Sequence, residues 1–282
     1  MSRLQGELVR GGSGGGWIVD HPDVAATRAD LETPRLPTSH SVRLGVLLAL
    51  VGGALDAFTF VGHGGVFANA QTGNIVLLGI EGSRGQWVRA LHHLPAILAF
   101  IMGVVVAESL KLPRAAAVVR WPARAALVLE IVVLAGVALL PTGTADMFVI
   151  VVIAFTASVQ VSTFRKLVDT AYNTTMTTGN LRTAVQSVYT AVVHRDREAA
   201  RRARQFATVI AAFLAGAFGS GLLTATGAVH TLWALVALLA MALALFVYDE
   251  RAAARSAVPA RPVDGPHPGR GRAAGTQVHF RR

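Results

Sequence analysis

The stretch GVFANAQTGNIVLLGIE, residues 65–81, has a counterpart later in the chain, AYNTTMTTGNLRTAVQSVYTAV, residues 171–192. Each contains Thr-Gly-Asn, at residues 72–74 and 178–180, among Gly, Asn and Thr residues. We call these two stretches the TGN segments. One tripeptide alone is weak evidence, but its recurrence at matching places in two halves of the chain indicates an internal duplication.

Long apolar runs surround the TGN segments. Each TGN segment follows one run and precedes two more, and the first of those two holds Phe-x-x-Gly, at residues 100–103 and 213–216. Six runs are long enough to cross a hydrocarbon core of about 30 Å, at residues 43–62, 95–112, 121–140, 146–164, 205–225 and 228–248. The sequence therefore predicts an all-α integral membrane protein with six full transmembrane helices plus the two TGN segments.

Composition supports this class and excludes a soluble domain. Hydrophobic residues make up 53% of the chain and charged residues only 15%, whereas soluble domains carry about 25% charged residues. The formal net charge of +10 comes from arginines gathered in residues 195–204 and 251–282. We interpret these clusters as topology signals beside a lipid membrane, and we expect no nucleic-acid partner.

The arginines also bear on whether the TGN segments cross the membrane. If both cross, the chain has eight crossings and parallel repeats, and the basic loops at 111–120 and 165–170 face outward, against the positive-inside tendency. If neither crosses completely, the basic segments all face the cytoplasm, and only Arg84 and Arg89 disagree. The sequence favours broken or re-entrant TGN segments. Each half then has three crossings, so the halves are inverted repeats.

The chain divides into three parts on this interpretation. Residues 1–41 form a disordered cytoplasmic tail, residues 42–250 the transmembrane domain, and residues 251–282 a basic, disordered cytoplasmic tail. Repeat one covers residues 43–140 and repeat two covers 146–248. Residues 1–41 lack the apolar stretch of a secretory signal. We expect a multi-pass protein of the bacterial inner (plasma) membrane with both termini in the cytoplasm.

Several motifs together resemble the YoaK family of bacterial multi-helix membrane proteins. They are Gly53-Ala54-Leu55-Asp56-Ala57, Phe67, Thr72-Gly73-Asn74 and Thr177-Thr178-Gly179-Asn180. The resemblance covers roughly residues 43–248 and implies an inner-membrane protein of six or slightly more helices, without a known substrate or reaction. In that family the second half often reads Gln-Asn-Ala, where this chain has Gln160-Val161-Ser162.

Two carboxylates lie inside apolar runs, where a charge costs about 2.5–3.5 kcal/mol on insertion scales. Asp56 is either a proton or cation site, or a cap for a TGN helix or a partner of Arg182. Glu130 has no charged neighbour closer in sequence than Arg124. It is either a proton-coupling residue or a neutral carboxyl bonded to a neighbouring helix.

The TGN segments supply the remaining candidate residues. Gly permits a break or a close backbone approach, and Thr and Asn can cap or bind. We predict that the two segments meet around one central polar cavity that binds solute through Asp56, Thr72, Gly73, Asn74, Gln160, Thr178, Gly179 and Asn180. The alternative is that the two glycines are packing notches and the threonines bond to their own helices.

The most concrete functional prediction is a transporter or channel for a small polar or ionic solute, with Asp56 or Glu130 coupling protons. The alternative is a non-transporting membrane scaffold or a membrane-embedded enzyme. The chain has no Cys, no metal-ligand spacing, no Gly-x-Ser-x-Gly and no phosphate loop, so we expect no catalytic activity, metal or cofactor. His92 and His93 are predicted to face solvent in a loop. A homo-oligomer is compatible with the sequence, which leaves the oligomeric state open.

Overall fold

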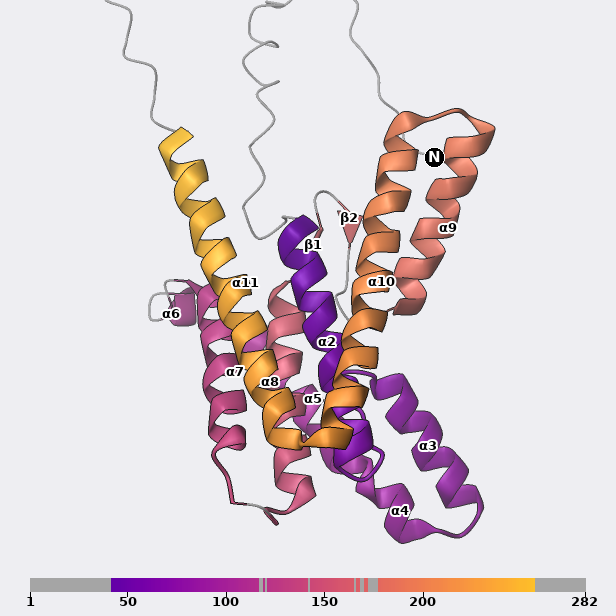
Figure 1. Ribbon diagram of the computed structural model, residues 1–282, viewed down its shortest axis with the longest axis vertical. Helices are drawn as coiled ribbons and strands as arrows, with labels where there is room; N and C mark the ends of the chain where they lie inside the picture. The colour runs from indigo at the N-terminus through magenta and orange to yellow at the C-terminus, as the bar shows by residue number, and fades with distance from the viewer. Residues whose placement is uncertain are drawn as a thin grey trace, which may run out of the picture. The chain divides into compact units, whose positions relative to one another are not determined.

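The computed structural model describes residues 42–116, 119, 121–141, 143–164, 166–167, 170–171 and 177–256 (Figure 1). The predicted tail at 1–41 and most of the one at 251–282 lie outside these residues. The helices are α2 (Val42–Gly62), α3 (Gln71–Ser83), α4 (Trp87–His92), α5 (Leu94–Ser109), α6 (Pro113–Ala116), α7 (Pro122–Ala138), α8 (Asp146–Thr163), α9 (Thr177–Val193), α10 (Arg197–Thr226) and α11 (Ala228–Ser256). Strands β1 (Lys166–Leu167) and β2 (Thr170–Ala171) form one short antiparallel pair.

Five helices in the described residues are long and apolar enough to span a membrane. They are α2, α4 and α5 taken together, α8, α10 and α11. Each coincides with one of the apolar runs identified in the sequence. Pro95 at the start of α5 has no N–H to donate, and the helix is interrupted between α4 and α5 just before it.

The TGN segments form two short helices, α3 and α9. With 13 and 17 residues, they are about 20 and 26 Å long at 1.5 Å per residue. Figure 1 shows that both begin near the middle of the helical bundle, where α9 runs up beside α10 and α3 runs down toward α4. The two helices therefore lead to opposite ends of the bundle.

Two hydrogen-bonded pairs of side chains show which helix ends lie together. His63, just after α2, places Nδ1 2.7 Å from Oδ1 of Asp146 at the start of α8. Arg124 at the start of α7 places Nη2 2.6 Å from Oε2 of Glu250 near the end of α11. Because each pair joins the beginning of one helix to the end of the other, α2 is antiparallel to α8 and α7 to α11.

Glycines bring two pairs of helices into close backbone contact. A Cβ at Gly216 of α10 would collide with the carbonyl of Leu50 on α2, and one at Gly53 of α2 would collide with the carbonyl of Phe213. Across α5 and α8, a Cβ at Gly103 would collide with Ser158. Gly53, Gly103 and Gly216 therefore serve the packing of these helices.

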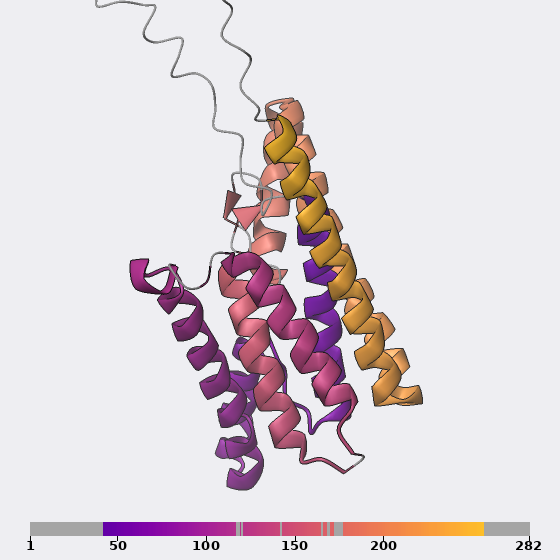
Figure 2. The same ribbon diagram turned by 90° about the vertical axis from the view of Figure 1, so that its left-hand side faces the viewer.

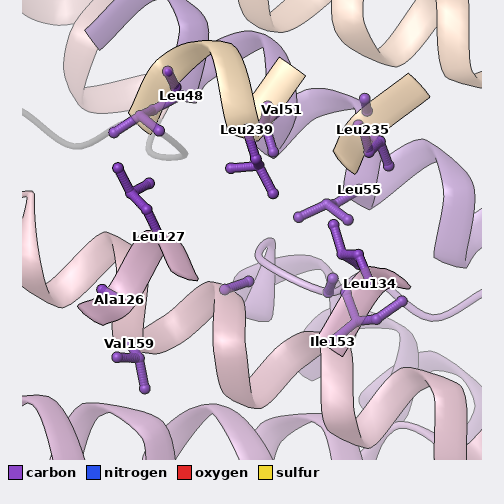
Figure 3. Packing of buried hydrophobic residues seen from close by; sticks show 14 of the residues in the cluster. Leu48, Val51, Leu55, Ala126, Leu127, Leu134, Ile153, Val159, Leu235 and Leu239 are labelled. Atoms are coloured by element: carbon purple, nitrogen blue, oxygen red, sulfur yellow. The ribbon is translucent and has the colours of Figure 1, made fainter. Parts of the chain in front are cut away.

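The largest apolar core lies among α2, α7, α8 and α11. Figure 3 shows leucines, valines and isoleucines of these helices pointing toward one another. In Figure 2, α5 lies on one side of α7 and α8, and the orange and yellow helices α10 and α11 lie on the other. The fully buried core residues include Leu48, Val51, Leu55, Leu127, Leu134, Ile153, Leu235 and Leu239.

One domain boundary needs correction. The predicted C-terminal tail begins at residue 251, but α11 continues to Ser256. The extra residues, RAAARS, are mostly Ala and Arg, which are among the strongest helix formers. The helix therefore continues beyond the apolar run, which ends at residue 248.

Candidate functional site

Asp56 lies on the buried face of α2 and binds the chain segment that leads into α3. Its Oδ1 accepts the backbone N–H of Asn69 at 2.6 Å and that of Ala70 at 3.3 Å. Only 5% of the residue is exposed. A carboxylate in this place satisfies donors at a helix N-terminus and is attracted by the helix dipole. Asp56 therefore has the contacts expected of a helix cap. The other structural alternative was a pair with Arg182, but Arg182 is exposed and forms no ion pair with any described residue.

Asn74 closes the turn before α3. Its Oδ1 accepts the backbone N–H of Phe67 at 2.9 Å, and its Nδ2 donates to the Phe67 carbonyl at 2.8 Å and to Gln71 Oε1 at 2.9 Å. Gly73 is needed beside it, because a Cβ there would lie 2.8 Å from the Phe67 ring. That ring stacks on Phe60 with centroids 4.5 Å apart. The first Thr-Gly-Asn therefore ties the end of α2 to the start of α3.

The second Thr-Gly-Asn shows the same distribution of exposure. Asn180 is buried and Thr178 and Gly179 are exposed, just as Asn74 is buried and Thr72 is exposed. Residues 172–176, which precede α9, lie outside the described residues. Val161, the departure from the family pattern, is a buried apolar residue and has no polar group with which to cap a helix as Asp56 does.

Glu130 of α7 and Gln160 of α8 form a buried polar pair. Gln160 Nε2 donates to Glu130 Oε2 at 2.5 Å, and the two residues are 0% and 1% exposed. Oε1 of Glu130 is buried without a hydrogen-bond partner, and no described basic residue pairs with this carboxyl. The bond to a neighbouring helix that was one alternative for Glu130 is present.

The structure brings the predicted site residues together in two groups. Asp56 and Asn74 belong to the network at the start of α3, whereas Gln160 bonds to Glu130. A cavity of about 120 Å³ between α2, α10 and α11 is lined by Ala54, Gly216, Ser220 and Thr231 among others. It includes none of the eight predicted binding residues, so a shared polar cavity stays a prediction.

A larger cavity, of about 460 Å³, lies where α3, α4 and α5 meet. We call it the end cleft, and its lining residues are Gly64, Glu81, Val88, Arg89, His92 and His93. The prediction that both histidines face solvent is wrong for His93, which is 3% exposed. His93 is the single residue between α4 and α5, which form a nearly continuous helix where the sequence indicates a loop, and its Nε2 faces Glu81 of α3.

Sequence reasoning did not select the end cleft, although one signal pointed to it. Arg84 and Arg89 are the two basic residues that conflict with the positive-inside tendency, and Arg89 lines the cleft. No group of three His, Cys, Asp or Glu side chains suited to a metal ion occurs in the residues that the structure describes.

Comparison with known proteins adds a family and one relative. The profile of a family described as a protein of unknown function (DUF1275) matches residues 44–245. The UPF0700 transmembrane protein YoaK of Bacillus subtilis (strain 168) is 30% identical over 147 residues, which are 50% of this chain and 64% of that protein. The chain thus spans slightly less than two thirds of the relative's length. No solved structure matches. The transmembrane relative and the five apolar helices together identify a multi-pass membrane protein.

Proposed function

The chain belongs to the DUF1275 family, and on that premise we propose that it is a transporter or channel for a small polar or ionic solute. The observation that carries the proposal is the pair of short helices α3 and α9, which begin near mid-height of the bundle and run to opposite ends (Figure 1). In several transporter folds, such discontinuous helices direct their N-termini toward solute near the middle of the membrane.

The antiparallel helix pairs support an inverted repeat, which is a second feature of those folds. In a duplication centred on the TGN segments, α2 corresponds to α8 and α7 to α11. His63 with Asp146 and Arg124 with Glu250 are the contacts expected if corresponding helices run in opposite directions. Parallel repeats would place these residues at opposite ends of the bundle.

The glycine contacts follow the same correspondence. Gly216 packs on Leu50, three residues before Gly53, and Gly103 packs on Phe155, three residues before Ser158. Gly103 and Gly216 both come from Phe-x-x-Gly. The contact between α5 and α8 thus repeats the contact between α2 and α10, as a two-fold axis that relates the two halves requires.

The proposal places six spans in the bacterial inner membrane. The sixth is α7, whose 17 residues equal those of α9 in number but lie in an apolar run and contribute Leu127 and Leu134 to the core. Both termini lie in the cytoplasm, together with the arginines of residues 195–204. The loops at 139–145 and 226–228 lie outside, and so do the end cleft and the junction of α3 with α4.

Purified protein in proteoliposomes tests transport directly. Flux is screened over anions, organic acids and amines, because the structure does not select one of these classes at the TGN helices. We expect Asn74→Ala and Asn180→Ala to reduce the flux, since each removes a buried amide at the start of a short helix. Thr208→Ala, at an exposed position of α10, should leave the flux unchanged. Protein-dependent flux of no solute would reject the transporter and favour the scaffold alternative.

We also propose that Glu130 or Asp56 couples transport to protons. Glu130 can exchange a proton at its unbonded Oε1 while Oε2 stays bonded to Gln160, and Asp56 holds the end of a TGN helix. We expect Glu130→Gln, Asp56→Asn or their combination to abolish the dependence of flux on a pH gradient. If all three variants retained that dependence, the carboxylates would be structural only.

A further inference from the structure

The end cleft carries an inference about solute class that rests on the proposed function. It is lined by Arg89, His92 and His93, which can donate hydrogen bonds, and by one carboxylate, Glu81. That carboxylate faces His93, with its Oε2 3.4 Å from His93 Nε2, and its Oε2 accepts no hydrogen bond from a described residue. Arg89 forms no ion pair with Glu81 or with any other described residue, so its guanidinium is available to a ligand.

Backbone geometry holds His92 in place. Gly64 has a φ of +74°, and a Cβ there would lie 2.7 Å from His92 Nε2, so a residue without a side chain lets the loop after α2 press against the imidazole. His93 is almost fully enclosed, and its Nδ1 has no hydrogen-bond partner. Because His93 directs Nε2 toward Glu81, the hydrogen-bond donors that a ligand in the cleft meets are the imidazole of His92 and the guanidinium of Arg89.

Arg89 is an exposed residue of α4 whose side of the membrane is unusual for an arginine. On the proposed topology it faces outward, where arginine is disfavoured during membrane insertion. Arg84 shares that position but does not line the cleft. An arginine beside two histidines is suited to oxygen anions, because guanidinium can bind a carboxylate or phosphate through two parallel hydrogen bonds. The volume of about 460 Å³ lies within the usual range of small-molecule sites.

We propose that the end cleft binds a small oxyanion, a carboxylate or a phosphate, through Arg89 and His92 at the outer entrance to the transport path. His93 and Glu81 form the polar wall that faces it. The site would concentrate an anionic solute before it reaches the TGN helices. Its binding is measurable whether or not the protein moves the anion.

Fluorescence of Trp87 reports binding without a transport assay. Trp87 directly precedes Val88 of the cleft lining and packs near Gly82. The full chain carrying Trp17→Phe, Trp121→Phe and Trp233→Phe keeps this one tryptophan. In nanodiscs of phosphatidylcholine, the protein is titrated with succinate, with inorganic phosphate and with tetramethylammonium chloride at matched ionic strength. We expect a saturable change with succinate or phosphate and none with tetramethylammonium.

Arg89→Gln should weaken that binding about tenfold or more, the loss expected for a charge-assisted hydrogen bond. Arg84→Gln is the matched control and should leave binding unchanged, since Arg84 is an exposed arginine outside the cleft. Glu81→Gln should keep or tighten the binding. Equal effects of Arg84→Gln and Arg89→Gln, saturation with tetramethylammonium alone, or no saturation with any probe would overturn the proposal.

Two further measurements distinguish a lipid phosphate from a soluble anion, and anion binding from transport. Nanodiscs containing phosphatidylglycerol distinguish the source of the anion, since a lipid phosphate in the cleft would compete with succinate and a soluble anion would bind equally in both membranes. Flux in proteoliposomes distinguishes this proposal from the general one. Anion binding without flux of any solute would retain the cleft and reject transport, whereas flux without anion binding would do the reverse.

Discussion

Asp56 shows how a carboxylate is accommodated inside an apolar helix bundle. It forms no ion pair with a described residue, and instead it accepts two backbone N–H groups that a chain entering a helix would otherwise leave unpaired. Asn69 adds a bond from its Nδ2 to the carbonyl of Gly52 at 3.3 Å. The carboxylate and the turn before α3 therefore stabilise each other.

Replacing Asp56 should destabilise the protein in a graded way. Asp56→Ala leaves two N–H groups without an acceptor, at a cost of about 1–3 kcal/mol for each buried unpaired group. Asp56→Asn keeps an acceptor oxygen and should cost less. Thermal unfolding of the purified protein in detergent gives both values. A stability of Asp56→Ala equal to that of the wild type would contradict the capping role.

Glu130 and Gln160 should be energetically coupled because each satisfies the other. Gln160→Leu leaves the carboxyl without a partner, and Glu130→Leu leaves the amide without one. The double variant removes both polar groups and should be less destabilised than the sum of the single variants, with a coupling of about 0.5–3 kcal/mol. Unfolding measurements that add without coupling would mean that the 2.5 Å contact contributes nothing.

At the scale of elements, the long apolar helices could be predicted from sequence because hydrophobicity alone marks them. The apolar runs at 43–62 and 146–164 agree closely with α2 and α8. The short lengths of α3 and α9 also follow from their Gly, Asn and Thr content. The hydrogen-bond partners of single side chains could not be predicted from the sequence. The bond between Asn74 and Phe67, for example, depends on how the chain turns back after α2.

The end cleft was beyond prediction for a similar reason. Glu81, Arg89 and His93 belong to three different elements or their junctions, and no spacing in the sequence relates them. The apolar pattern also could not show that His93 is buried. Two histidines in a loop and two histidines in a helix interrupted just before Pro95 give the same sequence pattern. Only the arginines that oppose the positive-inside tendency marked the region as unusual.

Glycine contacts give a prediction about pairs of helices. Gly216→Ala should lower stability by about 1–3 kcal/mol, because its Cβ would force α10 away from the Leu50 carbonyl. Gly219→Ala is the matched control on the same helix, since no described atom lies within 4 Å of a Cβ there. The apparent melting temperature of each variant provides the comparison. Equal destabilisation by both changes would argue against close packing of α2 and α10 at this point.

For the whole molecule, the central claim is that α3 and α9 do not cross and that the two halves are inverted. This claim sets the side of the membrane on which each loop lies. With eight crossings, the turn after α3 and the loop before α8 would face the cytoplasm and residue 114 would face outward. With the inverted arrangement, all three positions lie on the other side.

The absence of Cys from the chain makes labelling of single cysteines in intact cells the most direct test. Ser83→Cys and Ala145→Cys replace exposed residues and should react with a membrane-impermeant maleimide, whereas Arg114→Cys should react only after lysis. Thr226→Cys and His194→Cys serve as controls, because both topologies place the first outside and the second inside. Labelling of Arg114→Cys in intact cells together with protection of Ser83→Cys and Ala145→Cys would contradict the inverted repeat.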